Sequence, residues 1–174
     1  MYRLSKIRPE MYHSIAEYRE RFLCSGDTMD GTSNLERYDD IEKWHLNTLL
    51  FEDITTVPPG YSIAFEYAYV DENEVVGMVN IRPDALNHPY LKTYGGHIGY
   101  SIRPDKRRNN LGTSMLKDTL GVCKEEFNLK KVLITCLKEN VGSRKVIINN
   151  GGVFEKELFY PPEDKYIERY WINL

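Results

Sequence analysis

The segment Ile102–Leu116, which reads IRPDKRRNNLGTSML, lies between a strand pattern and a helix pattern. Before the segment, apolar and polar residues alternate, which predicts a strand over His97–Arg103. After it, apolar residues recur at helical spacing, which predicts a helix over Thr113–Phe127. The turn between the two is rich in Arg, Asn and Gly.

This turn has the chemistry of an anion-binding site. A helix N-terminus leaves backbone N–H groups unpaired and carries about half a positive charge, so phosphate oxygens bind there. Gly112 leaves room for the ligand, Asn110 suits a left-handed backbone, and Arg107 and Arg108 match phosphate geometry. On the turn alone, an ordinary loop with solvated arginines fits equally well. The candidate ligand-binding residues here are Ser101, Ile102, Arg103, Arg107, Arg108, Asn109, Asn110, Leu111, Gly112, Thr113 and Ser114.

The spacing differs from the two best-known phosphate loops, because the turn has neither a Gly-Lys-Ser/Thr ending nor a G-x-G-x-x-G series. It resembles instead the pyrophosphate loop of the GNAT superfamily of N-acetyltransferases, Arg-x-x-Gly-x-Gly/Ala. Arg107 and Gly112 match that pattern, and Asn110 replaces its first Gly.

A second segment makes this resemblance more specific. Val132–Cys136 reads as a buried strand, and NVGSRKVIINNGGVF follows at residues 140–154. It resembles the Asn-x-x-Ser/Ala helix and Gly-Gly-Phe exit of the same superfamily, and GGHIGYSIRP at residues 95–104 is similar to a bacterial group of predicted GNAT acetyltransferases. The resemblance implies that Asn140 bonds the pantetheine arm of coenzyme A, and that Ser143 or Arg144 reaches its nucleotide end.

Composition limits the remaining possibilities. With 174 residues, 41% hydrophobic and 28% charged, we expect one domain over residues 1–174. A net charge of -3 argues against nucleic-acid or membrane-surface partners. The three cysteines, Cys24, Cys123 and Cys136, form no C-x-x-C pair and no metal motif, so we expect free buried thiols in a reducing compartment. Since no apolar run approaches about 18 residues, we expect a cytoplasmic protein.

The order of the patterned segments predicts the fold. Strands are expected over residues 2–8, 61–70, 75–81, 97–103, 132–136, 154–160 and 165–173, and helices over 10–23, 36–51, 113–127 and from 140 onward. The expected inward faces of the first three helices are Met11, Ile15, Tyr18 and Phe22, then Ile41, Trp44 and Leu49 or Leu50, then Leu116, Leu120, Cys123 and Phe127. This order indicates an α/β domain with a mixed central sheet. The GNAT resemblance further implies that two central parallel strands, flanked by helices, splay apart and that the arm of CoA enters the gap between them.

Acyl transfer to nitrogen sets chemical requirements. An amine attacks only when neutral, yet a lysine-like amine titrates near 10.4, so a base is needed. We rank His97 first, because it precedes the strand beside the anion-binding turn and titrates near 6.5; in the alternative it only bonds a neighbouring loop. Glu66 and Glu74 are weaker candidates. Backbone N–H groups near Tyr100 could stabilise the oxyanion if the strand is unpaired there.

Acyl transfer also calls for a proton donor to the leaving thiolate. Many GNAT enzymes use a Tyr seven residues after the motif Asn, and Ile147 stands there. Tyr160, Tyr166 or Tyr170 of the terminal hairpin are substitutes, and Tyr100 is either core or pocket wall.

The resulting hypothesis is an acetyl-CoA-dependent N-acetyltransferase that acts on an unidentified small-molecule or peptide amine by direct attack in a ternary complex, without a metal. The carboxylates of Asp27, Asp30, Glu36, Asp39 and Asp40 either attract a cationic amine or form a solvated face. Two alternatives remain: a non-catalytic acyl-CoA binding or sensing module, and a nucleotide-binding or structural α/β protein. The edge of the terminal hairpin is compatible with a homodimer.

Overall fold

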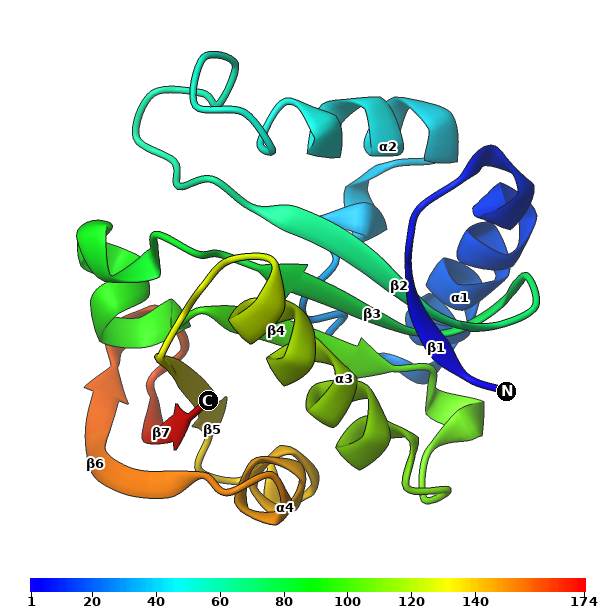
Figure 1. Cartoon of the computed structure of the whole chain (residues 1–174). Helices are drawn as coiled ribbons and strands as arrows, with labels where there is room; N and C mark the ends of the chain where they lie inside the picture. The colour runs from blue at the N-terminus through cyan, green and yellow to red at the C-terminus, as the bar shows by residue number, and fades with distance from the viewer.

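The computed structural model describes all 174 residues and contains two antiparallel sheets that approach each other along one side (Figure 1). The first sheet has the order β1-β2-β3-β4, with β1 Arg3–Lys6, β2 Phe65–Asp71, β3 Glu74–Ile81 and β4 Ile98–Ile102. The second has the order β5-β7-β6, with β5 Lys131–Leu137, β6 Val153–Tyr160 and β7 Lys165–Asn173. The predicted hairpin of the last two strands is confirmed.

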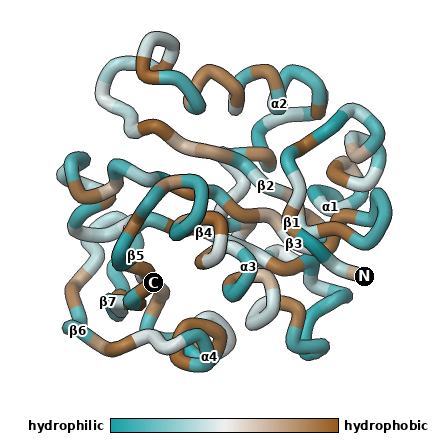
Figure 2. Tube along the Cα trace, viewed as in Figure 1, coloured by the Kyte–Doolittle hydropathy of each residue, from teal (hydrophilic) through white to brown (hydrophobic).

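Helices cover both faces of the first sheet. The four α-helices are α1 Tyr12–Ser25, α2 Ile41–Leu49, α3 Leu111–Glu125 and α4 Val141–Asn149. α1 and α2 share one core with Ala68, Val70 and Met78, whereas α3 shares the other with Tyr67 and Val79. Because side chains alternate along a strand, β2 and β3 serve both cores. Figure 2 shows the matching alternation of hydrophobic and hydrophilic residues along the helices. None of the helices combines the length and the hydropathy of a membrane-spanning segment.

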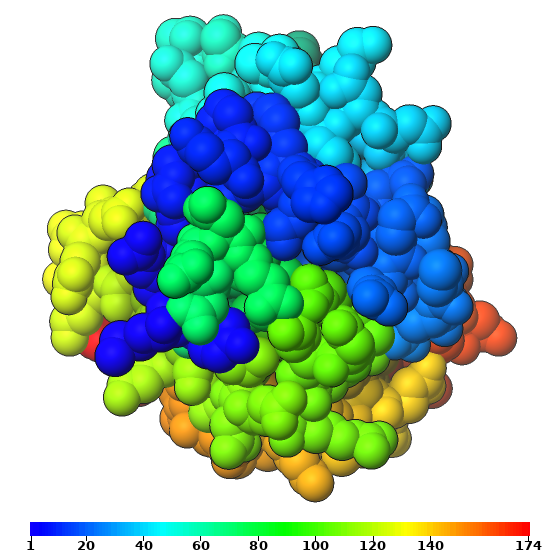
Figure 3. Space-filling model, turned by 90° about the vertical axis from the view of Figure 1, so that its right-hand side faces the viewer, coloured from blue at the N-terminus to red at the C-terminus, as the bar shows by residue number.

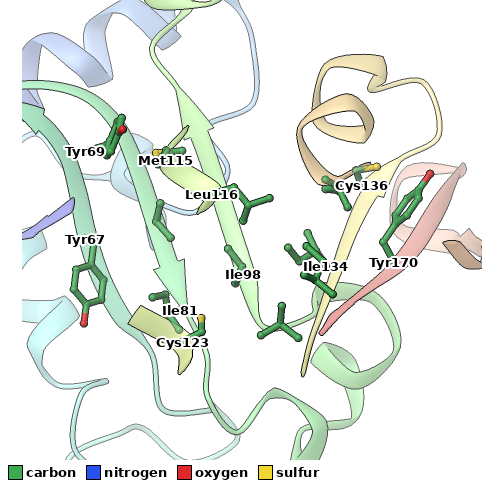
Figure 4. Packing of buried hydrophobic residues seen from close by; sticks show 14 of the residues in the cluster. Tyr67, Tyr69, Ile81, Ile98, Met115, Leu116, Cys123, Ile134, Cys136 and Tyr170 are labelled. Carbon is green, nitrogen blue, oxygen red and sulfur yellow. The ribbon is translucent and has the colours of Figure 1, made fainter. Parts of the chain in front are cut away.

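The two sheets separate between β4 and β5. At one end the N–H of His97 donates to the carbonyl of Leu133 at 2.8 Å, and the N–H of Leu133 donates to Nδ1 of His97 at 2.9 Å. Gly96 permits this approach, because a Cβ there would lie 2.5 Å from the Leu133 oxygen. Beyond these bonds the strands carrying Ile98 and Ile134 run in the same direction and diverge (Figure 4). The predicted GNAT-like fold with its splayed parallel strands is therefore confirmed.

Several predicted boundaries were wrong by a few residues. α3 begins at Leu111 rather than Thr113, because the N–H of Ser114 bonds the carbonyl of Asn110 and closes a turn earlier. The helix predicted over residues 36–51 divides into a 3₁₀ turn, Leu35–Arg37, and α2, whose N-cap carboxylate Asp40 accepts from the N–H of Lys43. The strand predicted from residue 61 begins at Phe65.

The predicted inward face of α1 is confirmed, since Met11, Ile15, Tyr18 and Phe22 are all buried. In α2, Ile41 and Trp44 are buried but Leu49 and Leu50 are exposed, and Thr48 completes the buried face because it lies one turn after Trp44. Cys123 and Cys136 are buried as predicted. The prediction was wrong for Cys24, which is exposed at the end of α1.

Candidate functional site

A cleft of about 840 Å³ lies where β4 and β5 diverge. It is bounded by the N-termini of α3 and α4, by the loop after α1, and by the hairpin turn between β6 and β7. The predicted site residues that line it are Tyr100, Ser101, Ile102, Arg107, Arg108, Asn110, Leu111, Gly112, Thr113, Asn140, Ser143 and Tyr160. His97, Arg103, Asn109, Ser114 and Arg144 do not line it.

The turn before α3 presents unpaired N–H groups to this cleft. Asn110 has a φ of 59°, the left-handed conformation expected from the sequence, and Arg108 adopts it too at 65°. No side chain caps the helix, and its first backbone bond comes from Ser114. The N–H groups of the three preceding residues, Leu111, Gly112 and Thr113, therefore remain available to an anion.

Gly112 lines the cleft at a close contact between three elements. A Cβ at Gly112 would stand 3.1 Å from Cγ2 of Val146 in α4 and 3.7 Å from Cγ1 of Ile102 in β4. The missing side chain therefore lets α3 pack closely on both elements and leaves its N–H groups uncovered.

The edge of β4 that faces the gap is also unpaired. Bonds from the N–H of Arg82 to the carbonyl of His97, and from the N–H of Arg103 to the carbonyl of Val76, fix which residues pair with β3. By alternation, the N–H groups of Tyr100 and Ile102 face away from β3 and toward β5. No ladder joins β4 to β5, so these groups can bond a ligand in the gap.

The two arginines of the turn differ in their contacts. Arg107 donates to Asp27 at 2.6 Å and to the carbonyl of Ile102 at 3.1 Å, and its guanidinium lies over the ring of Phe22. Arg108 forms no ion pair and is exposed. Figure 3 shows α1 (blue) beside the segment that follows β4 (light green), so α1 and its loop support the turn from one side.

The second motif surrounds the N-terminus of α4. Asn140 caps this helix by accepting from the N–H of Ser143 at 3.0 Å. The hydroxyl of Tyr100 lies 2.9 Å from Oγ of Ser143, so Tyr100 reaches across the gap from β4. Arg144 points elsewhere, because it is paired with Glu168 at 2.6 Å.

The opposite side of the cleft combines carboxylates, tyrosines and one arginine. Asp30 and Glu163 enter it from the loop after α1 and from the β6–β7 turn. Burial raises the pKa of Asp30 above its ordinary value, and the charge of Glu163 adds to this effect. Tyr90 and Tyr160 meet with their hydroxyl oxygens 2.7 Å apart.

The sequence did not identify four residues on this side: Arg82, Tyr90, Tyr94 and Glu163. The first three lie in or beside the long segment between β3 and β4, which folds into short turns and a π-helix, Leu91–Gly95. The two tyrosines of this segment, Tyr90 and Tyr94, were a signal in the sequence, but only the fold brings the segment against the β6–β7 turn.

The three residues considered as bases lie outside the cleft. His97 is buried, burial lowers its pKa to about 4, and its Nδ1 is occupied by Leu133. Glu66 is buried against Ser33 and Asn80. Glu74 is paired with Arg103 at 2.7 Å. These placements give no support to the prediction of His97 as the base.

The five acidic residues of the first loop and the start of the second helix, which were considered for binding a cationic amine, do not all lie at the cleft. Asp27 and Asp30 line the cleft, and with Glu36 they line a neighbouring hollow of about 740 Å³. Asp39 is paired with Arg19, and Asp40 caps α2. No group of three or more His, Cys, Asp or Glu side chains is arranged to hold a metal ion.

Comparisons with known proteins agree with this geometry. A family model described as an acetyltransferase (GNAT) domain matches residues 10–153. A solved RimL ribosomal L7/L12 acetyltransferase in complex with coenzyme A superimposes with a TM-score of 0.72 and 14% identity, covering 99% of this chain and 94% of that one. A ribosomal-protein-S5-alanine acetyltransferase from Vibrio fischeri gives 0.71 and 20%, covering 99% and 92%.

The spermidine N-acetyltransferase SpeG from Vibrio cholerae gives a TM-score of 0.65 at 15% identity, covering 98% of this chain and 94% of that one. No curated protein matches at a significant level. At these identities the solved structures establish the fold, whereas the family model spans most of the chain and establishes the family. This protein belongs to the GNAT family of acetyltransferases, which are acetyl-CoA-dependent acyltransferases.

Proposed function

We propose that this protein transfers the acetyl group of acetyl-CoA to a primary amine, which attacks the thioester directly in a ternary complex. One observation carries the proposal: unpaired N–H groups of α3 and the carboxylates of Asp30 and Glu163 line one and the same cleft. A diphosphate and an amine can therefore occupy it together.

The cofactor side fits coenzyme A in charge and in shape. The N–H groups of Leu111, Gly112 and Thr113 and the free guanidinium of Arg108 would hold the diphosphate. The unpaired edge of β4 would bond the amide groups of the pantetheine arm, and Asn140 lies at the far wall. When bound, acetyl-CoA supplies the acyl group as a thioester.

Asp30 is the carboxylate best suited to take the amine proton, directly or through a water molecule. Its raised pKa makes it a stronger base than an Asp with the ordinary value, and it lies in the cleft, unlike His97. The N–H of Tyr100 points into the gap, where it can donate to the oxygen that gains negative charge during attack.

Tyr160 lines the cleft, whereas Tyr166 and Tyr170, the other predicted donors, do not. Tyr100 also lines it, so Tyr100 and Tyr160 are the candidate proton donors. Ile147, at the usual Tyr position, is fully buried in the core and contributes no acid. Since a thiol near pKa 8.5 leaves readily as a thiolate, we expect Tyr100→Phe or Tyr160→Phe to lower kcat by about tenfold.

Steady-state release of CoA thiol tests the proposal with a panel of polyamines, aminoglycosides and peptides with free N-termini. We expect at least one acceptor, with kcat/KM falling by about 100-fold in Asp30→Asn and little in the matched surface variant Asp39→Asn. Tight CoA binding without any acceptor would instead favour the non-catalytic binding module.

The cytoplasmic location and the homodimer stay predictions. β6 is the outer strand of its sheet, and Val153, Phe154 and Phe159 on it are exposed. Unpaired backbone groups beside apolar side chains favour association of two copies. Light scattering of the purified protein would decide this point.

A further inference from the structure

Arg82 differs from the other enclosed arginines of the protein. Arg103 is paired with Glu74 and Asp105, and Arg169 is paired with Glu155 at 2.7 Å. No carboxylate oxygen lies within 4.0 Å of any Arg82 nitrogen. The single hydrogen bond of its guanidinium, from Nη1 to the carbonyl of Gly95, is long at 3.4 Å, and its buried Nε has no partner.

Two glycines hold the guanidinium in the cleft. A Cβ at Gly99 would lie 2.4 Å from Nη2 of Arg82, and a Cβ at Gly95 would lie 3.1 Å from Nη1. The guanidinium therefore lies against the backbone of β4 and of the segment before it. A side chain at Gly95 or Gly99 would fill the space that it occupies. Arg82 lines both the cleft and the neighbouring hollow, beside Tyr90.

The nearest acidic residues do not neutralise this cation. Glu66 bonds Ser33 and Asn80 instead, and burial raises its pKa to about 8, so it is largely protonated at neutral pH. Asp30 bonds the hydroxyl of Thr28 at 3.3 Å. Burial lowers the pKa of Arg82, because removing its charge from water disfavours the protonated form. A buried charge of this kind is stabilised when an anion binds it.

We propose that Arg82 binds a carboxylate of the acceptor, so that the substrate is an amine that also carries an anionic group, such as an α-amino acid. This inference rests on the proposed function and names its substrate class. The Arg82 fork suits bidentate binding of a carboxylate. Asp30 and Glu163, on the same side of the cleft, complement the ammonium end of such a zwitterion.

The test uses pairs of amines that differ only in the carboxylate: phenylalanine with 2-phenylethylamine, lysine with cadaverine, and methionine with 3-(methylthio)propylamine. O-phosphoethanolamine with ethanolamine tests a phosphate in place of the carboxylate. CoA release is measured with wild type, Arg82→Gln and Arg82→Lys. Arg37→Gln, which removes an exposed arginine outside both cavities, is the control.

We expect wild type to prefer at least one acid over its partner amine by about 10- to 100-fold in kcat/KM, the range for a charge-assisted hydrogen bond. Arg82→Gln should remove that preference while changing turnover of the carboxylate-free amine less than threefold, and Arg82→Lys should keep part of it. Equal turnover of both partners, or an equal loss for both in Arg82→Gln, overturns the inference. A purely structural role of Arg82 would give the second result.

A binding arm separates this inference from the proposed function. The melting temperature of the CoA complex is measured with the same pairs. If no amine is acetylated, but the acids alone stabilise wild type and fail to stabilise Arg82→Gln, the carboxylate site stands and the transferase proposal falls. If nothing is acetylated and nothing binds, both fall.

Discussion

At the scale of single residues, the surroundings of Glu66 oppose its charge. It is 3% exposed, and only one of its carboxyl oxygens has hydrogen-bond partners. Burial raises its pKa from 4.5 to about 8, so between these values the folded state holds a proton that the unfolded state releases. Stability should therefore fall as pH rises through this window, by at most about 1.4 kcal/mol per pH unit.

Glu66→Gln should remove this dependence, since the amide keeps an oxygen for Ser33 and Asn80 and never ionises. We expect the variant to exceed wild type in unfolding free energy by at least about 2 kcal/mol at pH 8.5, with a smaller difference at pH 5. Denaturant unfolding at both values checks this. A variant less stable than wild type at pH 8.5 would show that the ionised carboxylate is accommodated.

Gly112 provides a matched comparison within one helix. Gly112→Val places a side chain between α3, Val146 and Ile102 and beside the N–H groups expected to hold the diphosphate. Gly121→Val makes the same change on α3 where nothing lies within 4 Å. Calorimetry should show acetyl-CoA affinity at least about tenfold weaker in the first variant and unchanged in the second. Similar affinities in both would contradict the assigned diphosphate site.

Some residue-scale features could be predicted from sequence and others could not. The left-handed backbone at Asn110 follows from local preference, because Asn tolerates that region better than other side chains. The absence of an ion-pair partner for Arg82 could not be predicted, since the sequence does not indicate which carboxylates the fold places near its guanidinium. The role ranked first for His97 came from its place beside the strand, and tertiary packing decides its surroundings.

At the scale of elements, His97 joins the two sheets. Its Nδ1 accepts from Leu133, which requires a neutral ring, and burial lowers its pKa to about 4. In the unfolded state the imidazole binds a proton below about pH 6.5, whereas in the folded state it does so only below about pH 4. The free energy of unfolding therefore decreases as the pH falls from about 6.5 toward 4.

We predict that His97→Leu lowers the unfolding free energy by about 1–3 kcal/mol, because the N–H of Leu133 is left buried and unpaired. His97→Asn, whose side-chain oxygen can take the place of Nδ1, should retain most of that stability and keep kcat within about threefold. Thermal melts and CoA-release assays on both variants are sufficient. A loss of kcat near 100-fold in His97→Asn at unchanged stability would restore His97 as the base.

Element order and type were predictable, because amphipathic periodicity reports which face of each helix and strand is buried. Helix ends were less so: Asp40 caps α2 within a segment that reads as one continuous helix, and Asn110 starts α3 two residues early. A capping side chain sets the boundary at Asp40, and a left-handed backbone sets it at Asn110; apolar spacing reports neither.

At the scale of the whole molecule, the separation of the two sheets creates the site, and the sequence alone did not show it. Periodicity places β4 and β5 in a core but says nothing of the angle between them. That angle depends on Gly96, whose φ of 66° and missing side chain let one end of β4 touch β5 while the other end remains apart. The unpaired backbone left in the gap is what a ligand can complete.

Acetyl-CoA should therefore stabilise the molecule as a whole, because it would contact α3 and β4 on one side of the gap and the α4 wall on the other. At 100 times its dissociation constant, binding to the folded state adds about 2.7 kcal/mol. For a chain of this size we expect a rise in melting temperature of about 5–10 °C. S-acetyl-N-acetylcysteamine, which carries the thioester without the diphosphate, should give a much smaller shift at equal concentration. An equal shift with inorganic pyrophosphate alone would indicate a general anion site at α3 and leave the gap between β4 and β5 without a role in binding.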